Sequence, residues 1–400
     1  MMLADITVVE ISHPHTAVGG QILADLGARV IVIEPPTGSP MRRMEPFRDG
    51  PLTAESSLFW QAYNRGKHGV TLDLETPDGA HILRGLLGRA DVLLRAKGQQ
   101  IIPDAPPETI VDCVVRPFSR TGPRRDFAYT DMTLHASTGS PAATGNPDRA
   151  PLMLPTAPPV LEAGAEAAIG ILGALLARSA DGGGQQVGVS ARIAAMMSAL
   201  SAPYVALAPE WNRTRSTGTV VADVALPNIV PCKDGFVLVS IAFGGFVGMT
   251  ERLAALVCEL GYADPGLAKT QWRTFVADYQ AGALENKPLL DLVDAVLRFA
   301  LASSKSQIVD YAQEHRFFAA PMMEMSDIAE FDQYRDRGLF QPLSLFGDEV
   351  PFPATFARVP GVQIGATSPA PTLSQHTHEV LADLGYAPSE QQAMFAASII

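Results

Sequence analysis

Two apolar stretches rich in β-branched residues, Ile6-Thr-Val-Val-Glu10 and Ala28-Arg-Val-Ile-Val-Ile-Glu34, flank the helix-like stretch Gly20-Gln-Ile-Leu-Ala-Asp-Leu-Gly27. Short apolar runs of this composition are typical of buried strands. A strand, a helix and a second strand within about thirty residues form a βαβ unit, whose two strands are parallel and joined by a right-handed crossover. The beginning of the chain therefore predicts an α/β fold.

The same alternation continues along the first 125 residues. Thr76 followed by Pro77 signals the start of a helix, because threonine caps helix N-termini and the first turn tolerates proline. We expect a helix from Ala80 to Arg89. Three further strands are predicted, at Gly69–Leu74, Asp91–Leu94 and Thr109–Val115. The fold class predicted for this part is α/β of Rossmann-like type.

The later part of the chain predicts a smaller α+β domain. Asn228–Ser240 reads as a hairpin that turns at Lys233-Asp-Gly235. Three helices are expected after it, at Phe246–Leu260, Leu289–Ala302 and Ser304–His315. We place the small domain at 225–325 and the large domain at 1–220 plus 326–400, with a final helix at Glu379–Gly385 that returns to the first domain.

Composition limits the function classes. The 400 residues are 47% hydrophobic and 18% charged, with a net charge of −12. Nucleic-acid binding is disfavoured, because neutralising phosphates requires clustered lysine and arginine side chains, and the sequence has no such cluster. The start of the chain has no basic region of a signal peptide, and two apolar stretches, 163–180 and 193–209, are expected to be core helices rather than membrane spans. The three cysteines are widely spaced, which predicts neither disulfides nor a metal site and suits the cytoplasm.

No Gly-x-Gly-x-x-Gly follows the first strand, so a dinucleotide fingerprint is missing from the sequence. The densest glycine cluster, Asp181-Gly-Gly-Gly-Gln-Gln186, precedes the strand-like Val187–Ser190 and favours a turn over a phosphate-binding loop.

Several dispersed segments, in the right order, resemble the class III CoA-transferases (the CaiB/BaiF family). They are Leu23–Glu34, Asn64-Arg-Gly-Lys-His-Gly-Val-Thr-Leu-Asp-Leu74, Thr121-Gly-Pro-Arg-Arg-Asp126, Pro151–Gly170, Gly182-Gly-Gly-Gln185 and Gln375-His-Thr-His-Glu-Val-Leu381. The resemblance spans nearly the whole chain. It implies an interlocked dimer of ring-like chains, CoA and acyl-CoA as substrates, and no tightly bound cofactor.

The resemblance also implies a catalytic position that this chain has changed. In the family an aspartate attacks the acyl-CoA thioester to give a mixed anhydride, and Val160 occupies the matching position. An aliphatic side chain can be neither a nucleophile nor a base. Racemases with this fold use the aspartate together with a histidine, and Thr130 occupies the position of that histidine.

Two loops depart from the family pattern as well. After Ala90–Leu94 the family has a Glu-Asn-Phe-Arg-Pro-Gly-like loop that contacts the CoA nucleotide, whereas this chain has Arg95-Ala-Lys-Gly-Gln-Gln100. A loop usually rich in alanine, glycine and proline reads Ser12-His-Pro-His-Thr-Ala-Val18.

Two carboxylates are candidate catalytic residues in place of the missing aspartate. Asp131 is either an acid or base near the site or, as we favour, a carboxylate at a helix N-terminus. Glu162 follows Val160 by two residues, which on a helix directs it to another face, so a solvated or capping role is favoured over a substitute nucleophile.

Five residues are candidates for binding the CoA thioester. His13 and His15 follow the first strand, where open α/β sheets bind ligands, although a loop histidine is more often a surface or hydrogen-bonded residue. Arg42, Arg43 and Lys67 are candidate phosphate ligands, because guanidinium and ammonium groups form charge-assisted hydrogen bonds; for each, a solvated surface position is equally compatible with the sequence. His135, on a helix-like stretch, is more simply a core histidine.

Three functions remain open. The first is a subunit of a CoA-transferase that moves CoA between an acyl-CoA and a carboxylic acid, paired with an aspartate-bearing paralogue. The second is a homomeric acyl-CoA lyase, dehydratase, isomerase or racemase with altered catalytic residues. The third is a non-catalytic acyl-CoA binder.

Overall fold

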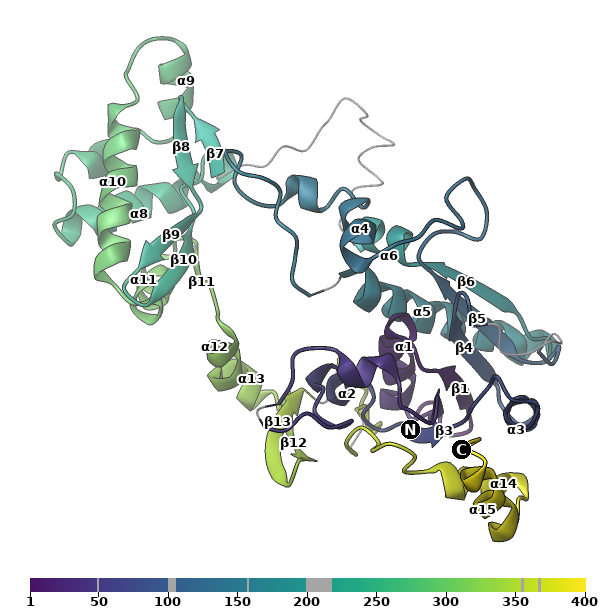
Figure 1. Cartoon of the computed structure of the whole chain (residues 1–400). Coiled ribbons are helices and arrows are strands. Elements are labelled where there is room, and N and C mark those ends of the chain that lie inside the picture. Colours follow the sequence, from purple (N-terminus) through teal and green to yellow (C-terminus); the bar gives the residue numbers. More distant parts are fainter. Residues whose placement is uncertain (49, 100–105, 157, 199–217, 354–355, 366–367) are drawn as a thin grey trace. The chain divides into compact units, whose positions relative to one another are not determined.

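The computed structural model describes the 400-residue chain except residues 49, 100–105, 157, 199–217, 354–355 and 366–367 (Figure 1). The chain divides into two compact units. The first comprises Met1–Ala142, Met153–Asn212 and Asp332–Ile400, and the second comprises Ala143–Leu152 and Arg213–Phe331. The second unit therefore includes a short segment near residue 150 that the sequence-based division at 225–325 does not contain.

A parallel sheet with the strand order β3-β2-β1-β4-β5-β6 forms the centre of the first unit. Each neighbouring pair is parallel, as the predicted βαβ units require. The strands are β1 (Thr7–Ile11), β2 (Arg29–Glu34), β3 (His68–Thr71), β4 (Val92–Ala96), β5 (Val111–Arg116) and β6 (Gln186–Ser190). The α/β fold class is confirmed.

The helices of the first unit follow the start signals of the sequence. Thr76 caps α3 through a hydrogen bond from the Gly79 backbone N–H, as predicted. The helices are α1 (Pro14–Asp25), α2 (Leu58–Tyr63), α3 (Pro77–Leu87), α4 (Asp131–Ala136), α5 (Pro158–Asp181), α6 (Ala191–Ser198), α13 (Asp332–Asp336), α14 (Thr377–Leu384) and α15 (Pro388–Ala396), with 3₁₀ turns η1 (Pro40–Arg43) and η2 (Pro141–Ala143). A hairpin of β12 (Phe340–Leu345) and β13 (Asp348–Pro353) completes the unit.

Apolar side chains cover both faces of the sheet, because successive residues of a strand point to opposite faces. Val8 of β1 belongs to the core under α1 and α5, whereas the next residue, Val9, belongs to the core under α3 and α14. The C-terminal helix returns to this sheet, as expected: the backbone N–H of Gly69 in β3 donates to Nδ1 of His376, just before α14.

Helices α1 and α5 lie against each other on one face of the sheet, and glycines permit the close approach. A Cβ atom added to Gly164 of α5 would lie 2.6 Å from Cβ of Val18 in α1. Both helices run from the carboxyl end of the sheet to its amino end, where Arg178 of α5 pairs with Asp91 at 2.7 Å. The first turns of both helices therefore lie at the carboxyl end.

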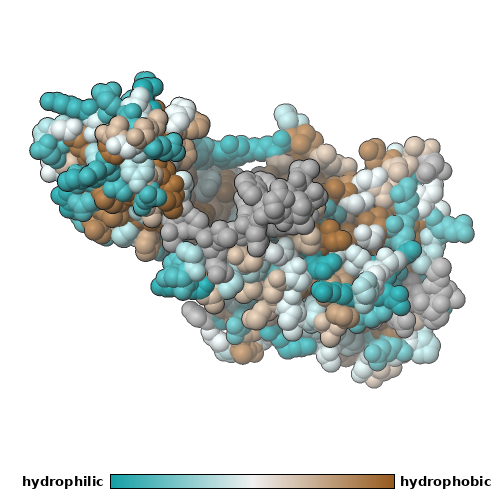
Figure 2. Space-filling view, turned by 90° about the horizontal axis from the view of Figure 1, so that it is seen from above, coloured by the Kyte–Doolittle hydropathy of each residue, from teal (hydrophilic) through white to brown (hydrophobic). Residues whose placement is uncertain are grey.

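Among the described residues, α5 is the one helix long and apolar enough to cross a bilayer by length and composition. A core helix of a soluble protein passes the same test, and α5 buries its alanines against α1 and the sheet. Its remaining face is exposed: Ile169 is 63% and Leu176 is 75% accessible. Figure 2 shows apolar residues among hydrophilic ones on the surface of both units.

The second unit has its own core around Trp272, Phe275 and Phe299, which are almost fully buried. The predicted hairpin is present as β9 and β10, and β11 adds a third strand. The elements are β7 (Gly218–Val221), β8 (Val224–Pro227), β9 (Ile229–Cys232), β10 (Gly235–Val239), η3 (Gly244–Phe246), α8 (Val247–Glu259), η4 (Leu267–Lys269), α9 (Phe275–Gln280), α10 (Lys287–Ala302), α11 (Lys305–His315), β11 (Ala319–Pro321) and α12 (Met325–Glu330).

Candidate functional site

The strand order places a switch point between β1 and β4, because the chain proceeds in opposite directions across the sheet from these two strands. Open α/β sheets bind ligands at the carboxyl ends of the strands at such a point. Here the two loops are joined: Nε2 of Gln99, after β4, donates to the carbonyl oxygen of Ser12, after β1, at 3.2 Å. The hydroxyl of Ser12 also donates to that of Ser39, after β2, at 2.7 Å.

Two histidines occupy the loop between β1 and α1, as the sequence places them. Nδ1 of His13 accepts the backbone N–H of His15 at 3.1 Å and caps α1, so a neutral His13 carries its proton on Nε2. The two rings lie 5.1 Å apart. Burial lowers the pKa of both histidines to about 4, and for His15 the neighbouring His13 adds to the effect. Both imidazoles are therefore neutral at pH 7.

Tyr129 extends this cluster. Its ring stacks on that of His15, with 5.7 Å between centroids and 23° between planes. The next residue, Thr130, caps α4, and Asp131 is the first residue of that helix, where a carboxylate interacts favourably with the helix dipole. Oδ1 of Asp131 is buried with no hydrogen-bond partner among the described residues, and burial raises the pKa of this carboxyl, opposed by His135.

Val160 lies on the first turn of α5 and is 5% exposed. Gly164 of α5 and Gly19 of α1 lie against each other where the two helices meet. Val160 is one turn before Gly164, and His15 is one turn before Gly19. Val160 and His15 therefore lie at the same end of the helix pair. Glu162 accepts a hydrogen bond from the hydroxyl of Ser198 in α6. Its second carboxylate oxygen, Oε2, is buried and has no partner among the described residues.

Two of the candidate phosphate ligands are instead structural. Arg42 is buried, forms a bidentate pair with Glu34 at 2.7 and 2.8 Å, pairs with Glu55 at 2.7 Å and lies over the Trp60 ring. Lys67 is fully buried, forms an ion pair with Glu10 at 2.7 Å, and donates to the Ala17 carbonyl oxygen and to Oδ1 of Asn64. Because its ammonium is buried and its charge is already paired, Lys67 is not available to a phosphate.

Arg43 remains a candidate, because its side chain is exposed next to the buried Arg42. The unusual loop after β4 is described up to Gln99, and Gln100 lies outside the described residues. Arg95 pairs with Asp112 at 2.8 Å and Lys97 pairs with Asp126 at 2.8 Å, so these cations are engaged within the chain.

A family model described as CoA-transferase family III matches residues 3–377. The chain belongs to CoA-transferase family III. This family III chain is 27% identical over 406 positions to the succinyl-CoA:(R)-benzylsuccinate CoA-transferase subunit BbsE of Thauera aromatica, covering 93% of this chain and 91% of the relative. It is 29% identical to the succinyl-CoA–D-citramalate CoA-transferase of Chloroflexus aurantiacus, covering 94% and 92%.

A third relative is the alpha subunit of succinyl-CoA–L-malate CoA-transferase of Chloroflexus aurantiacus. It is 24% identical, and the match covers 96% of this chain and 88% of the relative. The fold matches a solved CaiB/BaiF family protein from Brucella suis with a TM-score of 0.77, 24% identity, and coverage of 95% and 98%. The predicted fold is thus confirmed, and the family III chain is a class III CoA-transferase-like protein, of a family whose substrates are CoA thioesters.

The cluster of His13, His15 and Tyr129 at the switch point provides neutral hydrogen-bonding groups rather than a cation. The Nε2–H of His13 can donate to a carbonyl or thioester oxygen. The first turn of α1 has no backbone N–H to spare, because Pro14 lacks one, His15 donates to Nδ1 of His13, and Thr16 and Ala17 donate to its carbonyl oxygen. Two carboxylates, Asp131 and Glu162, come from α4 and α5, and each has one unpartnered buried oxygen among the described residues. Neither has the position in sequence that the family's nucleophile takes.

Sequence reasoning missed Tyr129 and Gln99. Tyr129 contacts His15 across more than one hundred residues, and Gln99 reaches Ser12 across 87. No local signal marks either contact, because neither residue type has a pattern that specifies a distant partner. The parallel sheet brings the three loops together.

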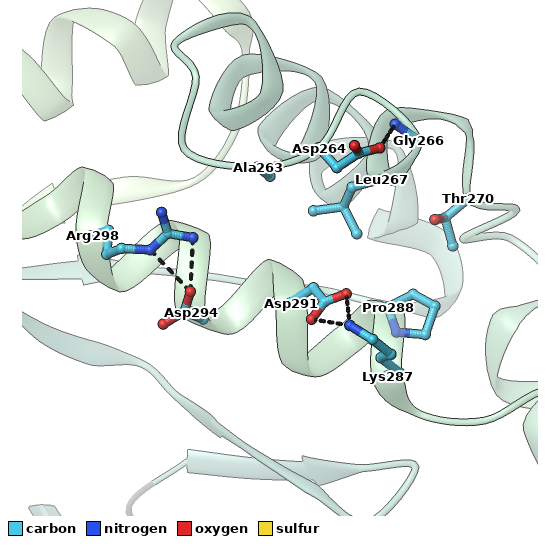
Figure 3. Close-up of a pocket in the computed structure, with 10 residues that line it drawn as sticks. All are labelled: Ala263, Asp264, Gly266, Leu267, Thr270, Lys287, Pro288, Asp291, Asp294 and Arg298. Carbon is cyan, nitrogen blue, oxygen red and sulfur yellow. Dashed lines mark hydrogen bonds and ion pairs between the residues drawn. The ribbon is translucent and has the colours of Figure 1, made fainter.

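No group of three or more potential metal-binding side chains occurs among the described residues, and the described cysteines are free. The pocket in Figure 3 lies in the second unit between α10 and the 263–270 segment. Four of its charged side chains form ion pairs, Lys287 with Asp291 at 2.6 Å and Arg298 with Asp294 at 2.8 Å, and Asp264 accepts the backbone N–H of Gly266. With these charges neutralised, we assign no function to this pocket.

Proposed function

We propose that this chain is a subunit of a heteromeric CoA-transferase that moves CoA between an acyl-CoA and a carboxylic acid, and that its partner subunit supplies the nucleophilic aspartate. The observation that carries the proposal is Val160. This aliphatic side chain is buried on the first turn of α5, at the end of the helix pair that also holds His15. The resemblance aligns it with the family's nucleophile, and valine cannot attack a thioester.

Two of the relatives are themselves named as subunits of CoA-transferases, BbsE and the malate enzyme's alpha subunit. Their names, and that of the citramalate enzyme, include succinyl-CoA and a second acid with two carboxyl groups. We therefore propose succinyl-CoA and a dicarboxylic acid as the first substrates to test, and a dimer with an aspartate-bearing paralogue as the assembly.

The test is to purify the chain alone and in complex with partners recovered from its host, and to measure CoA transfer from succinyl-CoA. We expect no transfer by the chain alone and transfer by the complex. Full activity of the chain as a homodimer would overturn the proposal.

Val160→Asp with Val160→Asn as its matched control sharpens the test. The two variants have nearly the same shape, but only the aspartate can attack the thioester carbon, expel the CoA thiolate and form a mixed anhydride. The thiolate can then attack the aspartyl carbonyl carbon of the anhydride, which releases the donor acid as a carboxylate and leaves CoA on the enzyme as a thioester. We expect Val160→Asp alone to gain a hydroxylamine-sensitive, CoA-containing adduct, detected by mass spectrometry, and Val160→Asn to gain none.

A homomeric enzyme with altered chemistry is the second candidate. It is favoured by the unpartnered buried oxygens of Asp131 and Glu162, and by the raised pKa of Asp131, since catalytic acids and bases often have perturbed pKa values. Asp131→Asn and Glu162→Gln in a purified homomer would each abolish turnover of an acyl-CoA if that residue is the acid or base. Unchanged turnover in both variants would remove Asp131 and Glu162 as the catalytic acid or base.

A further inference from the structure

A second pocket of the first unit lies away from the switch point, along β5, β6 and the start of α6. It has a volume of about 390 Å³, which is within the range of small-ligand sites. Arg116, the last residue of β5, lines it together with Arg120, Ser119 and Ser190. Ile193 and Met197 of α6 line it as well.

The two arginines of this pocket form no ion pair within the described part of the chain. Asp112, the acid nearest Arg116 in the sheet, accepts two hydrogen bonds from Arg95, at 2.9 and 2.8 Å. Arg120 donates to the amide oxygen of Gln186 rather than to a carboxylate. Within the part of the chain that the structure describes, neither Arg116 nor Arg120 forms a salt bridge.

The electrostatic environment of Arg116 agrees with this picture. Burial lowers the pKa of its guanidinium, and the positive charges of Arg95 and Arg120 add to the effect. A guanidinium that is half-buried beside two others is stabilised by an anion that approaches it. Glu166 of α5 is the single carboxylate that lines the pocket.

The pocket also has apolar lining residues that are open to solvent. Ile193 is 43% and Met197 is 48% exposed on α6. An aliphatic chain lying on these two residues would remove part of their surface from water, which is favourable by about 25 cal/mol per Å² of apolar surface buried. The pocket thus pairs two guanidinium groups with apolar side chains.

We propose that this pocket binds a free short-chain carboxylic acid, with its carboxylate on Arg116 and Arg120 and its aliphatic chain on Ile193 and Met197. A monoanionic carboxylate together with Glu166 balances the two guanidinium charges of the pocket, whereas a phosphate dianion would leave an excess negative charge. The planar guanidinium matches a carboxylate with two parallel hydrogen bonds. The proposal does not depend on the chemistry at Val160.

The test is calorimetric titration of butyrate and, separately, inorganic phosphate into the full chain, in the oligomeric form in which it purifies. We expect butyrate to bind and phosphate to bind more weakly. Arg116→Gln should weaken butyrate binding by about tenfold or more, since it removes charge-assisted hydrogen bonds. Arg298→Gln is the matched control, because its guanidinium is already paired in the second unit, and it should leave binding unchanged.

Ile193→Glu provides a second variant should Arg116→Gln fold poorly, because the side chain is partly exposed. The added carboxylate would pair with the arginines and should abolish butyrate binding. Absence of butyrate binding to the native chain, or equal binding in both variants, would overturn the proposal. Phosphate binding as tight as butyrate would overturn its carboxylate specificity.

Kinetics of the active complex distinguish two roles for the bound acid, acceptor of CoA and effector. If it is the acceptor, Arg116→Gln raises the KM for that acid. If it is an effector, butyrate changes the rate of transfer to a different acceptor, and Arg116→Gln removes the change. These assays concern transfer, whereas the calorimetric result stands even if the heteromeric function is wrong.

Discussion

Replacing Arg42 by methionine removes its charge while keeping much of the side chain's length, and it should destabilise the first unit strongly. Arg42 bonds Glu34 in bidentate fashion, pairs with Glu55 and donates to the Pro371 carbonyl, 329 residues away. Breaking a buried ion pair from one side typically costs about 3–5 kcal/mol, because the partner charge stays buried.

Arg43→Ala is the matched control, because the neighbouring arginine is exposed. An exposed substitution of this kind changes stability within about 0.5 kcal/mol. The double variant Glu34→Gln/Arg42→Met should regain part of the loss, because no unpaired carboxylate is then left at Glu34.

The assay is urea unfolding followed by tryptophan fluorescence. Trp60, which lies under the Arg42 guanidinium at 3.9 Å, reports on the first unit, and Trp272 on the second. We expect the Arg42→Met loss in the transition of the first unit alone. Unchanged unfolding of Arg42→Met, with acyl-CoA binding lost, would refute the structural role and return Arg42 to the phosphate ligands.

Further predictions concern the helix pair and the histidines. Gly164→Ala should lower the free energy of unfolding in urea by about 1–3 kcal/mol, because the new Cβ overlaps Val18. The control Gly173→Ala, on the same helix but with open space around it, should stabilise the chain by up to about 1 kcal/mol. Equal effects of the two variants would contradict the close packing of α1 and α5. His13 and His15 have folded pKa values of about 4 and ordinary values of 6.5, so their contribution to stability is complete above pH 6.5 and is lost as the pH falls towards 4. The His15→Gln variant should therefore show a smaller fall in unfolding midpoint between pH 6.5 and 4 than the native chain, and identical pH profiles would speak against a buried neutral imidazole.

Much of the fold follows from local sequence signals. The strands of the sheet and the cap at Thr76 were predicted because periodicity and capping depend on neighbours within a few residues. The hairpin at Lys233–Gly235 was predictable for the same reason, and Gly235 adopts the positive φ of 139° that such a turn requires of glycine. The family assignment was predictable as well, because it rests on short segments and on their order along the chain, and both can be read from the sequence.

The candidate site was only partly predictable. His13 and His15 were found because a loop after the first strand of a parallel sheet reaches its carboxyl end wherever the rest of the chain lies. Tyr129 was not, because its contact with His15 depends on how the long segment after β5 returns to α1.

The sequence by itself determined the α/β class, the strands, the family and the valine at position 160, because each is a property of residue order or of neighbours. It could not distinguish Arg42 from Arg43, which are adjacent and chemically identical. Only the tertiary structure decided that Arg42 is buried against Glu34, Glu55 and the Pro371 carbonyl while Arg43 faces solvent. A charge is structural or free to bind according to the groups that surround it, and those groups come from distant parts of the chain.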